Sequence, residues 1–240
     1  MTTNKFSKGK AYSGKLPEAK AKVKQILSWS YSRFNKWYEC PAAAKYKFLD
    51  KIEEPQGEAM ARGERIHKLA EDYAKGKLKK LPEELKNFKE QFADLKKSKP
   101  ICEEMWCFRS DWSETHDKDW DGIWLRVKTD AAVRDGSDVY VIDHKTGKNR
   151  GGYGDQMELS ALVTFLKFPE AKRVITQLWF LDSGDIVEAE YMASDVARLK
   201  KKWEKKVAPM LADTSFHPKP SPSACKYCFY SKKKNGPCRF

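Results

Sequence analysis

The sequence has no apolar run long enough to cross a membrane. A transmembrane helix needs about 20 consecutive apolar residues, and no stretch of the 240-residue chain approaches that length. The N-terminal segment MTTNKFSKGKAYSGK also lacks the apolar core of a secretory signal. We therefore expect a cytoplasmic, intracellular protein with no membrane partner.

Acidic residues are scarce at both ends of the chain. Residues 1–24 contain seven lysines and one glutamate, and residues 217–240 contain five lysines and Arg239 with no acid. Each end carries a net charge of +6 out of +13 for the whole chain, so the region between is almost neutral. Cationic arms neutralise phosphates and release counterions, which favours DNA or RNA as a partner over two merely solvated tails.

The composition favours one folded domain with extended ends. Hydrophobic residues make up 40% and aromatic residues 12% of the chain, enough for one core. We divide the chain into a basic flexible arm (1–27), a central domain (28–216) and a basic cysteine-rich tail (217–240). No internal repeat or coiled-coil heptad array interrupts this organisation.

Helical patterns fill the first hundred residues, and strand patterns follow. A first helix is predicted through SYSRFNKWYECPAAAKYKF, with Pro41 bending it and placing Cys40 at the joint. Further helices are predicted at about 58–76, 82–97, 155–167 and 194–212. The one at 82–97 is expected to be amphipathic, with an apolar face formed by Leu85, Phe88, Phe92 and Leu95. Strands are predicted in ICEEMWCFRSDW, GIWLRVKTDAAV, DVYVIDHKT, KRVITQLWFLD and DIVEAEYM. This order predicts an α/β fold, a central sheet flanked by helices.

The last part of DVYVIDHKT holds a polar cluster. Side chains alternate along a strand, so Asp143 and Lys145 point to one face and His144 points away. The apolar residues VYVI before them favour a half-buried central strand. The alternative is a surface Asp–Lys pair on an edge strand, which contributes little to stability.

Asp130 on the preceding strand is expected to join this cluster. A two-residue turn at Asp135-Gly136 would place Asp130 diagonal to Asp143, and a four-residue turn over 135–138 would place it directly opposite. Both registers put the two carboxylates and the Lys145 ammonium on one face, with Cβ atoms about 5 to 8 Å apart.

Two carboxylates this close repel each other unless a cation lies between them. An oxygen-rich site with room for water and phosphate suits Mg²⁺ or Mn²⁺. The metal would activate a water and stabilise the charge on phosphorus, while Lys145 would orient or deprotonate that water. This is the chemistry of phosphodiester hydrolysis.

Four motifs resemble the RecB-like nucleases of the PD-(D/E)xK superfamily, including the iron-sulfur exonucleases associated with CRISPR adaptation and their phage relatives. In family order they are SYSRFNKWYECP, GERIHKLAEDYAKG, VKTD and VIDHKTGK, and the resemblance covers about residues 28 to 240. It implies a restriction-endonuclease-like core with a mixed central β-sheet. It also implies a metal-dependent DNA exonuclease acting on free ends or single strands, with a phage-encoded protein in a bacterial host as one source.

The resemblance also implies roles for single residues. His67 would bind the metal with Asp130, Asp143 and the backbone carbonyl of His144. Gln156 would contact DNA, although the tyrosine that the family has four residues later is Ser160 here.

Three further residues are candidates on their position alone. Glu71 shares a helix face with His67 and could fix the imidazole tautomer. Glu104 could add an acidic ligand or lie there by chance. Arg150 lies in the loop KNRGGYGDQ, which either approaches a phosphate or is a flexible connector.

The six cysteines divide into two groups. Cys102 and Cys107 lie in an apolar strand and are expected to be buried thiols. The other four, Cys40, Cys225, Cys228 and Cys238, resemble the four-cysteine [4Fe-4S] site of the same branch, which would hold the tail on the N-terminal helix. Nine residues separate Cys228 from Cys238, more than is usual in the family. Zn²⁺ is the alternative, and spacing does not decide between the two.

Other functions remain open at this level. The main alternative is a non-catalytic nucleic-acid binding module whose cysteine cluster is structural. An iron-sulfur electron-transfer protein and a site-specific restriction endonuclease are two others. The sequence does not indicate an oligomeric state.

Overall fold

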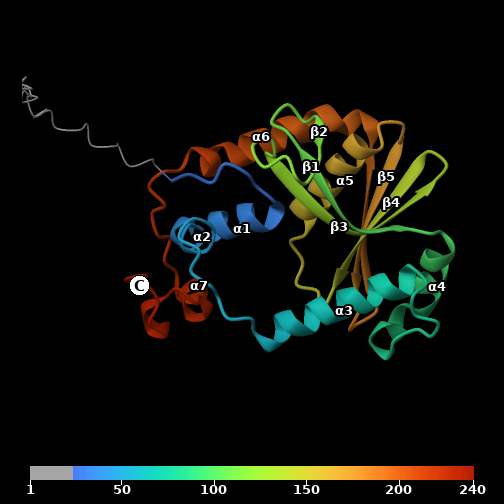
Figure 1. Ribbon diagram of the computed structural model, residues 1–240, viewed down its shortest axis with the longest axis horizontal. Helices are drawn as coiled ribbons and strands as arrows, with labels where there is room; N and C mark the ends of the chain where they lie inside the picture. Colours follow the sequence, from blue (N-terminus) through green and yellow to red (C-terminus); the bar gives the residue numbers. More distant parts are fainter. Residues whose placement is uncertain (1–23) are drawn as a thin grey trace, which may run out of the picture.

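The computed structural model describes residues 24–240, which form a six-stranded sheet between two layers of helices (Figure 1). The helices are α1 (Tyr31–Glu39), α2 (Pro41–Phe48), α3 (Glu58–Ala74), α4 (Lys89–Lys97), α5 (Gly154–Lys167), α6 (Val196–Ala212) and α7 (Pro222–Tyr227), with short 3-10 segments η1 (Glu83–Phe88), η2 (Ala193–Asp195) and η3 (Lys232–Lys234). The strands are β1 (Ile101–Phe108), β2 (Glu114–Thr115), β3 (Leu125–Asp135), β4 (Asp138–Lys145), β5 (Arg173–Phe180) and β6 (Asp185–Met192). No helix among these is long and apolar enough to span a bilayer.

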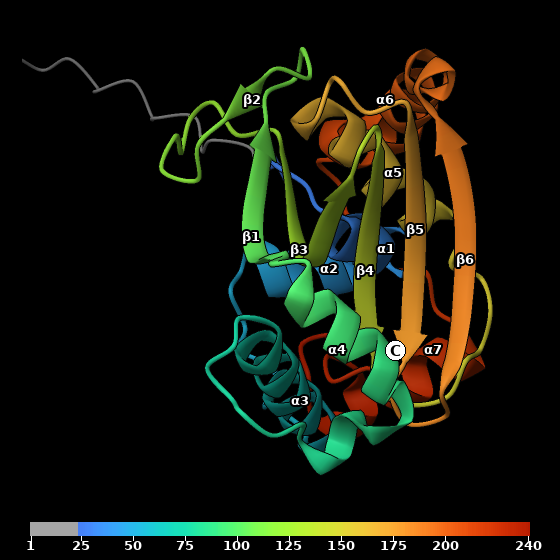
Figure 2. The ribbon, with the colours of Figure 1, turned by 90° about the vertical axis from the view of Figure 1, so that its right-hand side faces the viewer.

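The sheet is mixed, as expected. Its order is β2-β1-β3-β4-β5-β6, and β4 and β5 run parallel while the other neighbours are antiparallel. A parallel pair needs a crossover connection, and α5 provides it. α3 and α4 cover one face of the sheet, and α5 and α6 cover the other (Figure 2).

The β3–β4 pairing has the register expected for the turn over residues 135–138, although Asp135 and Asp138 themselves also pair. Asp135 pairs with Asp138 and Ala131 pairs with Ile142, so the two-residue turn is Gly136-Ser137. Gly136 has φ +59°, the left-handed backbone that tight hairpins require. Continued by one residue, this register would set Asp130 directly opposite Asp143.

The helix expected over residues 82–97 is divided. Its first part is the 3-10 segment η1, and α4 begins only at Lys89 because Phe88 (φ −121°, ψ 32°) leaves the helical region. Leu85, Phe88, Phe92 and Leu95 are all buried. The apolar face was therefore predicted correctly, whereas the three-residue spacing of Leu85 and Phe88 suits the tighter 3-10 turn.

The core on the α5 and α6 side is built around stacked aromatic rings. Trp203 of α6 lies with its ring centroid 5.4 Å from that of Trp29 and 5.6 Å from that of Phe34. Not every aromatic residue of α1 belongs to this core, since Tyr38 is 60% exposed.

The expected boundary of the basic arm at residue 27 differs from the structure. Ile26 is already buried in the core, so the packed chain begins before residue 28. The greater part of the arm, residues 1–23, lies outside the described residues.

The C-terminal segment packs against α1 and α2. The Lys219 ammonium donates to the carbonyl of Tyr38 (3.1 Å), and the Tyr230 hydroxyl donates to the carbonyl of Ile52 (3.3 Å). Cys40 separates α1 from α2 in an extended conformation (φ −159°, ψ 107°), the geometry that a following proline imposes. Figure 1 shows α7 beside α2.

Candidate active site and cysteine pocket

The candidate active site lies where β3 and β4 separate. The β3–β4 ladder ends at the Ala131–Ile142 pair, while β3 continues along β1. Asp130 and Asp143 are the first residues beyond that last pair. No ladder hydrogen bonds join β3 and β4 beyond that pair, so the two side chains project from the point where the strands separate.

Asp130 is held by two histidines. Its Oδ2 lies 3.2 Å from Nδ1 of His67 on α3, and it accepts the backbone N–H of His144 at 2.8 Å. The His144 imidazole is 3.9 Å from the same oxygen. His67, Asp130 and His144 each offer a ligand atom within 4.8 Å of the others.

The charges in this group are coupled. Burial opposes ionisation of Asp130, but the hydrogen bond to His67 and the nearby His144 together lower its pKa. The same hydrogen bond raises the pKa of His67. Burial lowers the pKa of His144 to about 4, so its imidazole is neutral. Asp130 is thus an anion facing two nitrogen ligands.

A divalent cation fits this donor set. Both nitrogens of the buried His144 imidazole lack a hydrogen-bond partner among the described residues, and a buried polar atom without a partner is costly. Carboxylate oxygen and imidazole nitrogen are ordinary ligands of divalent metals.

Asp143, Lys145 and Gln156 form a second group on the α5 side. The Lys145 ammonium lies 2.8 Å from Oδ2 of Asp143 and donates to Oε1 of Gln156 at 3.1 Å. The Gln156 amide donates to Oδ1 of Asp143 at 2.8 Å. Burial raises the pKa of Asp143, and the charge of Asp130 raises it further against the opposing effect of Lys145.

The expectation of one shared face needs correction. Strand N–H groups lie in the plane of a sheet, so the bond from His144 places the Asp130 carboxylate beside the β4 backbone, towards α3. Asp143 and Lys145 do share a face, that of α5, and His144 points away from it as predicted. Asp143 also lies outside the 4.8 Å group. The separation of the strands, which the pairing rules do not anticipate, turned Asp130 out of the common face.

α3 is fixed closely against the end of β4. A Cβ at Gly63 would lie 3.3 Å from Oγ1 of Thr146, so a glycine suits this close approach. The guanidinium of the preceding residue, Arg62, pairs with Asp182 (2.6 Å), whose carboxylate also accepts the Gly147 N–H (2.8 Å). These contacts position His67 relative to Asp130.

The suggested roles of Glu71 and Glu104 are not seen. The Glu71 carboxylate pairs with Lys68 (2.8 Å) and Lys75 (2.7 Å), and Asp130 holds His67 instead. Glu104 pairs with Lys167 at 3.3 Å. It does not line the cleft that contains His67 and Asp130. Lysines of the same helix neutralise Glu71, and a lysine of α5 pairs with Glu104.

Sequence reasoning missed Glu103 and Lys128, which pair with each other and line the cleft at His67 and Asp130. Glu103 adopts φ +57°, which interrupts the alternation of β1. Because of that interruption, Cys102 and Trp106 lie on opposite faces of the sheet. No residue pattern in ICEEMWCF indicated it.

The two predicted DNA contacts have different surroundings. Gln156 contacts Asp143 and Lys145, as described above. Arg150 lies exposed in the loop after β4, where its N–H donates to the Tyr153 hydroxyl at 3.2 Å.

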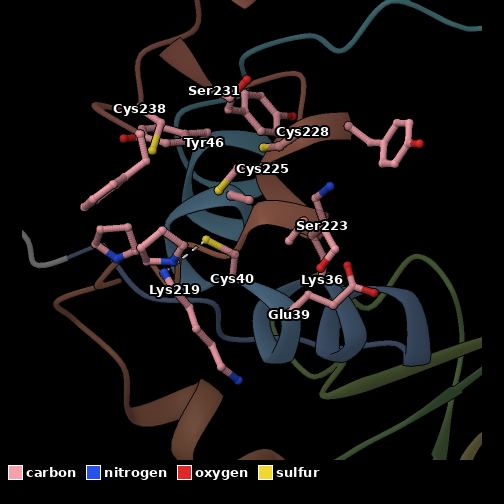
Figure 3. A pocket seen from close by; sticks show the side chains of 17 residues that line it. Lys36, Glu39, Cys40, Tyr46, Lys219, Ser223, Cys225, Cys228, Ser231 and Cys238 are labelled. Atoms are coloured by element: carbon pink, nitrogen blue, oxygen red, sulfur yellow. Dashed lines mark hydrogen bonds between the residues drawn. The ribbon is translucent and has the colours of Figure 1, made fainter. Parts of the chain in front are cut away.

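A second cavity, about 450 Å³ in volume, lies between α1, α2 and the C-terminal segment. Its lining includes Cys40, Cys225, Cys228 and Cys238, and Figure 3 shows these four side chains around it. All four are free thiols, and the Lys219 N–H donates to the sulfur of Cys40 at 3.5 Å. Cys102 and Cys107 are free and buried in the sheet, as predicted.

Comparisons with known proteins agree with this architecture. The sequence model of the PD-(D/E)XK nuclease superfamily matches residues 28–232. The matching solved structures include one of SSO0001, with 17% identity, coverage of 87% of this chain and 85% of that one, and a TM-score of 0.49. Another, from Eubacterium rectale, is named "Putative exonuclease", with 11% identity, 89% coverage of each chain and a TM-score of 0.50. At that identity the similarity shows a shared fold alone. The comparison with curated proteins found no match.

Proposed function

This chain belongs to the PD-(D/E)XK nuclease superfamily, and we propose that it is a Mg²⁺- or Mn²⁺-dependent exonuclease that hydrolyses phosphodiester bonds at DNA ends or in single strands. The observation that carries the proposal is the contact of Asp143 with Lys145 and Gln156 beside the His67–Asp130 pair. The net charge of +13 supports a polyanionic substrate.

The proposed metal ligands are His67, Asp130, Asp143 and the backbone carbonyl of His144. The raised pKa of Asp143 includes repulsion from Asp130, and a divalent cation would relieve that repulsion. The metal supplies an activated water and neutralises charge on the phosphate.

Lys145 is the proposed catalytic lysine. Its ammonium is already oriented by Asp143 and Gln156, so it can hold a non-bridging phosphate oxygen and the attacking water in one place. As the water attacks phosphorus it loses a proton to the solvent, the bond to the leaving sugar oxygen breaks, and that oxygen takes up a proton from the solvent. Gln156 is a positioning residue for both Asp143 and Lys145, and Arg150 is proposed to contact the DNA strand nearby.

The test is digestion of 5′- and 3′-labelled single- and double-stranded DNA with Mg²⁺ or Mn²⁺. Lys145→Ala and Asp143→Ala should abolish cleavage and leave DNA binding largely intact, because the charged ends of the chain remain. The product ladder gives the polarity. Cleavage by these variants at the wild-type rate would refute the site. Salt-sensitive binding without cleavage under any divalent metal would favour the non-catalytic binding module instead.

We further propose that the four-cysteine cavity holds a [4Fe-4S] cluster rather than Zn²⁺. Zn–S bonds of about 2.3 Å place the sulfurs of a tetrahedral site about 3.8 Å apart. Among the described residues, no three cysteine sulfurs lie within 4.8 Å of one another. The wider spacing suits a larger group with the same four thiolate ligands.

Metal analysis of anaerobically purified protein tests this cofactor. Iron and acid-labile sulfide in equal amounts are expected, with a matching absorption band that Cys225→Ser and Cys228→Ser remove. Stoichiometric zinc without sulfide would establish the alternative. Cys107→Ala serves as the control, since Cys107 is buried in β1 away from the cavity.

A further inference from the structure

A third cavity, about 390 Å³ in volume, opens beside Asp143 on the α5 side of the sheet. The start of α1, the start of β3 and the first turns of α5 form its walls. Asp143 and Gln156 belong to its lining, so it adjoins the candidate active site directly. The site described above does not use it.

Three cationic side chains line this cavity, namely Arg33, Arg126 and Lys128. Lys128 pairs with Glu103, but among residues 24–240 no carboxylate forms an ion pair with either guanidinium. Most other arginines of the described chain do have such a partner, as Arg62, Arg173 and Arg198 show. Two unpaired guanidinium groups beside one cavity thus stand out within this protein.

The two guanidinium groups are close enough to repel. Burial and the charge of Arg126 both lower the pKa of Arg33. Arg33 uses one nitrogen locally, donating from Nη1 to the carbonyl (3.0 Å) and hydroxyl (2.9 Å) of Ser28. Its other donors are not used in that contact. An anion between the two arginines would satisfy them and remove the repulsion.

The rest of the cavity suits a nucleotide. The Ser30 and Ser32 hydroxyls, 3.0 Å apart, lie at the start of α1. Met105, 41% exposed, offers an apolar surface on the same wall. Beyond the cavity the Arg126 guanidinium lies over the ring of Trp120 (5.4 Å), and this indole is 74% exposed. An exposed aromatic ring beside cations is the usual platform for an unstacked base.

We propose that Arg33 and Arg126 form a phosphate-binding subsite for the nucleic-acid strand, next to the scissile phosphate. This inference rests on the proposed nuclease function. The ligand is a phosphate of the bound strand, either a backbone diester or a terminal monoester. Arginine suits both, because its planar fork donates two hydrogen bonds to phosphate oxygens.

The experiment measures binding of fluorescent single-stranded oligonucleotides, with and without a 5′-phosphate, in EDTA so that no cleavage occurs. Arg126→Ala should raise Kd about tenfold, the effect of losing one charge-assisted hydrogen bond. The slope of log K against log salt should become shallower by about 0.7. Arg126→Lys, which keeps the charge, should retain the slope.

Arg198→Ala is the matched control, because Arg198 is an exposed arginine on α6 whose one ion pair among residues 24–240 is with Asp195. Its Kd and slope should equal those of the wild type. A loss confined to the 5′-phosphorylated oligonucleotide identifies a terminal monoester, and an equal loss for both identifies a diester. Unchanged Kd and slope in folded Arg126→Ala would overturn the inference.

This outcome is separable from the proposed function. Cleavage that depends on Lys145, together with unaltered binding by Arg126→Ala, would overturn the subsite and leave the nuclease intact. Weakened binding by Arg126→Ala in a protein that cleaves under no metal would uphold the subsite and refute the catalytic proposal.

Discussion

The backbone and the side chain of His144 contact different groups. Its backbone N–H holds Asp130, and its imidazole packs against Phe92 and Trp179, with ring centroids 5.4 Å and 5.7 Å away. Burial in this aromatic setting lowers the pKa of the imidazole to about 4. The neutral form of His144 therefore predominates in the folded protein at neutral pH.

A prediction for stability follows from that pKa. Between pH 6.5 and 4 the unfolded chain binds a proton that folded His144 does not, so stability falls as pH falls. The loss from this residue is about 2 kcal/mol between pH 7 and pH 5. Urea unfolding of His144→Leu in EDTA should show that much less pH dependence than the wild type. An identical pH dependence in the two proteins would contradict the assignment.

The raised pKa of His67 acts in the opposite direction. Its ion pair with Asp130 stabilises the fold below the unfolded pKa of about 6.5 and is lost as pH rises through the higher folded value. Because both the wild type and His144→Leu retain His67, the comparison between them isolates the contribution of His144.

At the scale of an element, the close contact between α3 and β4 delivers the imidazole of His67 to the site. α3 begins without a side-chain cap, so its position depends on packing and on the Arg62–Asp182 ion pair. Gly63 allows the helix to approach Thr146. A larger side chain there would push the helix away from the sheet and His67 away from Asp130.

We therefore predict that Gly63→Leu lowers Mn²⁺-dependent cleavage by about tenfold or more, since misplacing a metal ligand is costly. Mn²⁺ titration by calorimetry should show weaker binding in parallel. Ala61→Leu is the control, because Ala61 is exposed on the same helix. Equal activity of Gly63→Leu and Ala61→Leu would show that the approach of α3 is not limiting.

At the scale of the whole molecule, the cysteine cavity joins the two ends of the described chain. Cys40 precedes the sheet, whereas Cys225, Cys228 and Cys238 follow it, so a group bound to all four closes a loop around the nuclease core. Cross-linking over such a distance lowers the entropy of the unfolded chain.

The corresponding prediction is that Cys40→Ser lowers the thermal midpoint and exposes the tail. Limited proteolysis should then cleave within residues 217–240 before the core is cut. Cys102→Ala removes a buried thiol of β1 and should leave the tail protected from the protease. A tail that remains equally resistant in Cys40→Ser would mean that the bound group does not hold it.

Local patterns determined much of this protein. The alternation in DVYVIDHKT placed Asp143 and Lys145 on one face and His144 on the other, and Pro41 placed Cys40 at a joint between helices. The helices and strands and their order along the chain were likewise predicted, because helix and strand periodicities are local. The apolar face of residues 82–97 was predicted, although its division into two helical types was not.

Tertiary structure alone decided what surrounds the reacting groups. The separation of β3 from β4 moved the Asp130 carboxylate towards α3, and a left-handed residue at Glu103 brought an unexpected acid and Lys128 to the same cleft. Lysines from neighbouring turns and elements form ion pairs with the carboxylates of Glu71 and Glu104. The sequence by itself specified which groups are available, since residue type and period are encoded locally. Which of them meet depended on helix approach and strand divergence, because those depend on contacts between segments far apart in the chain.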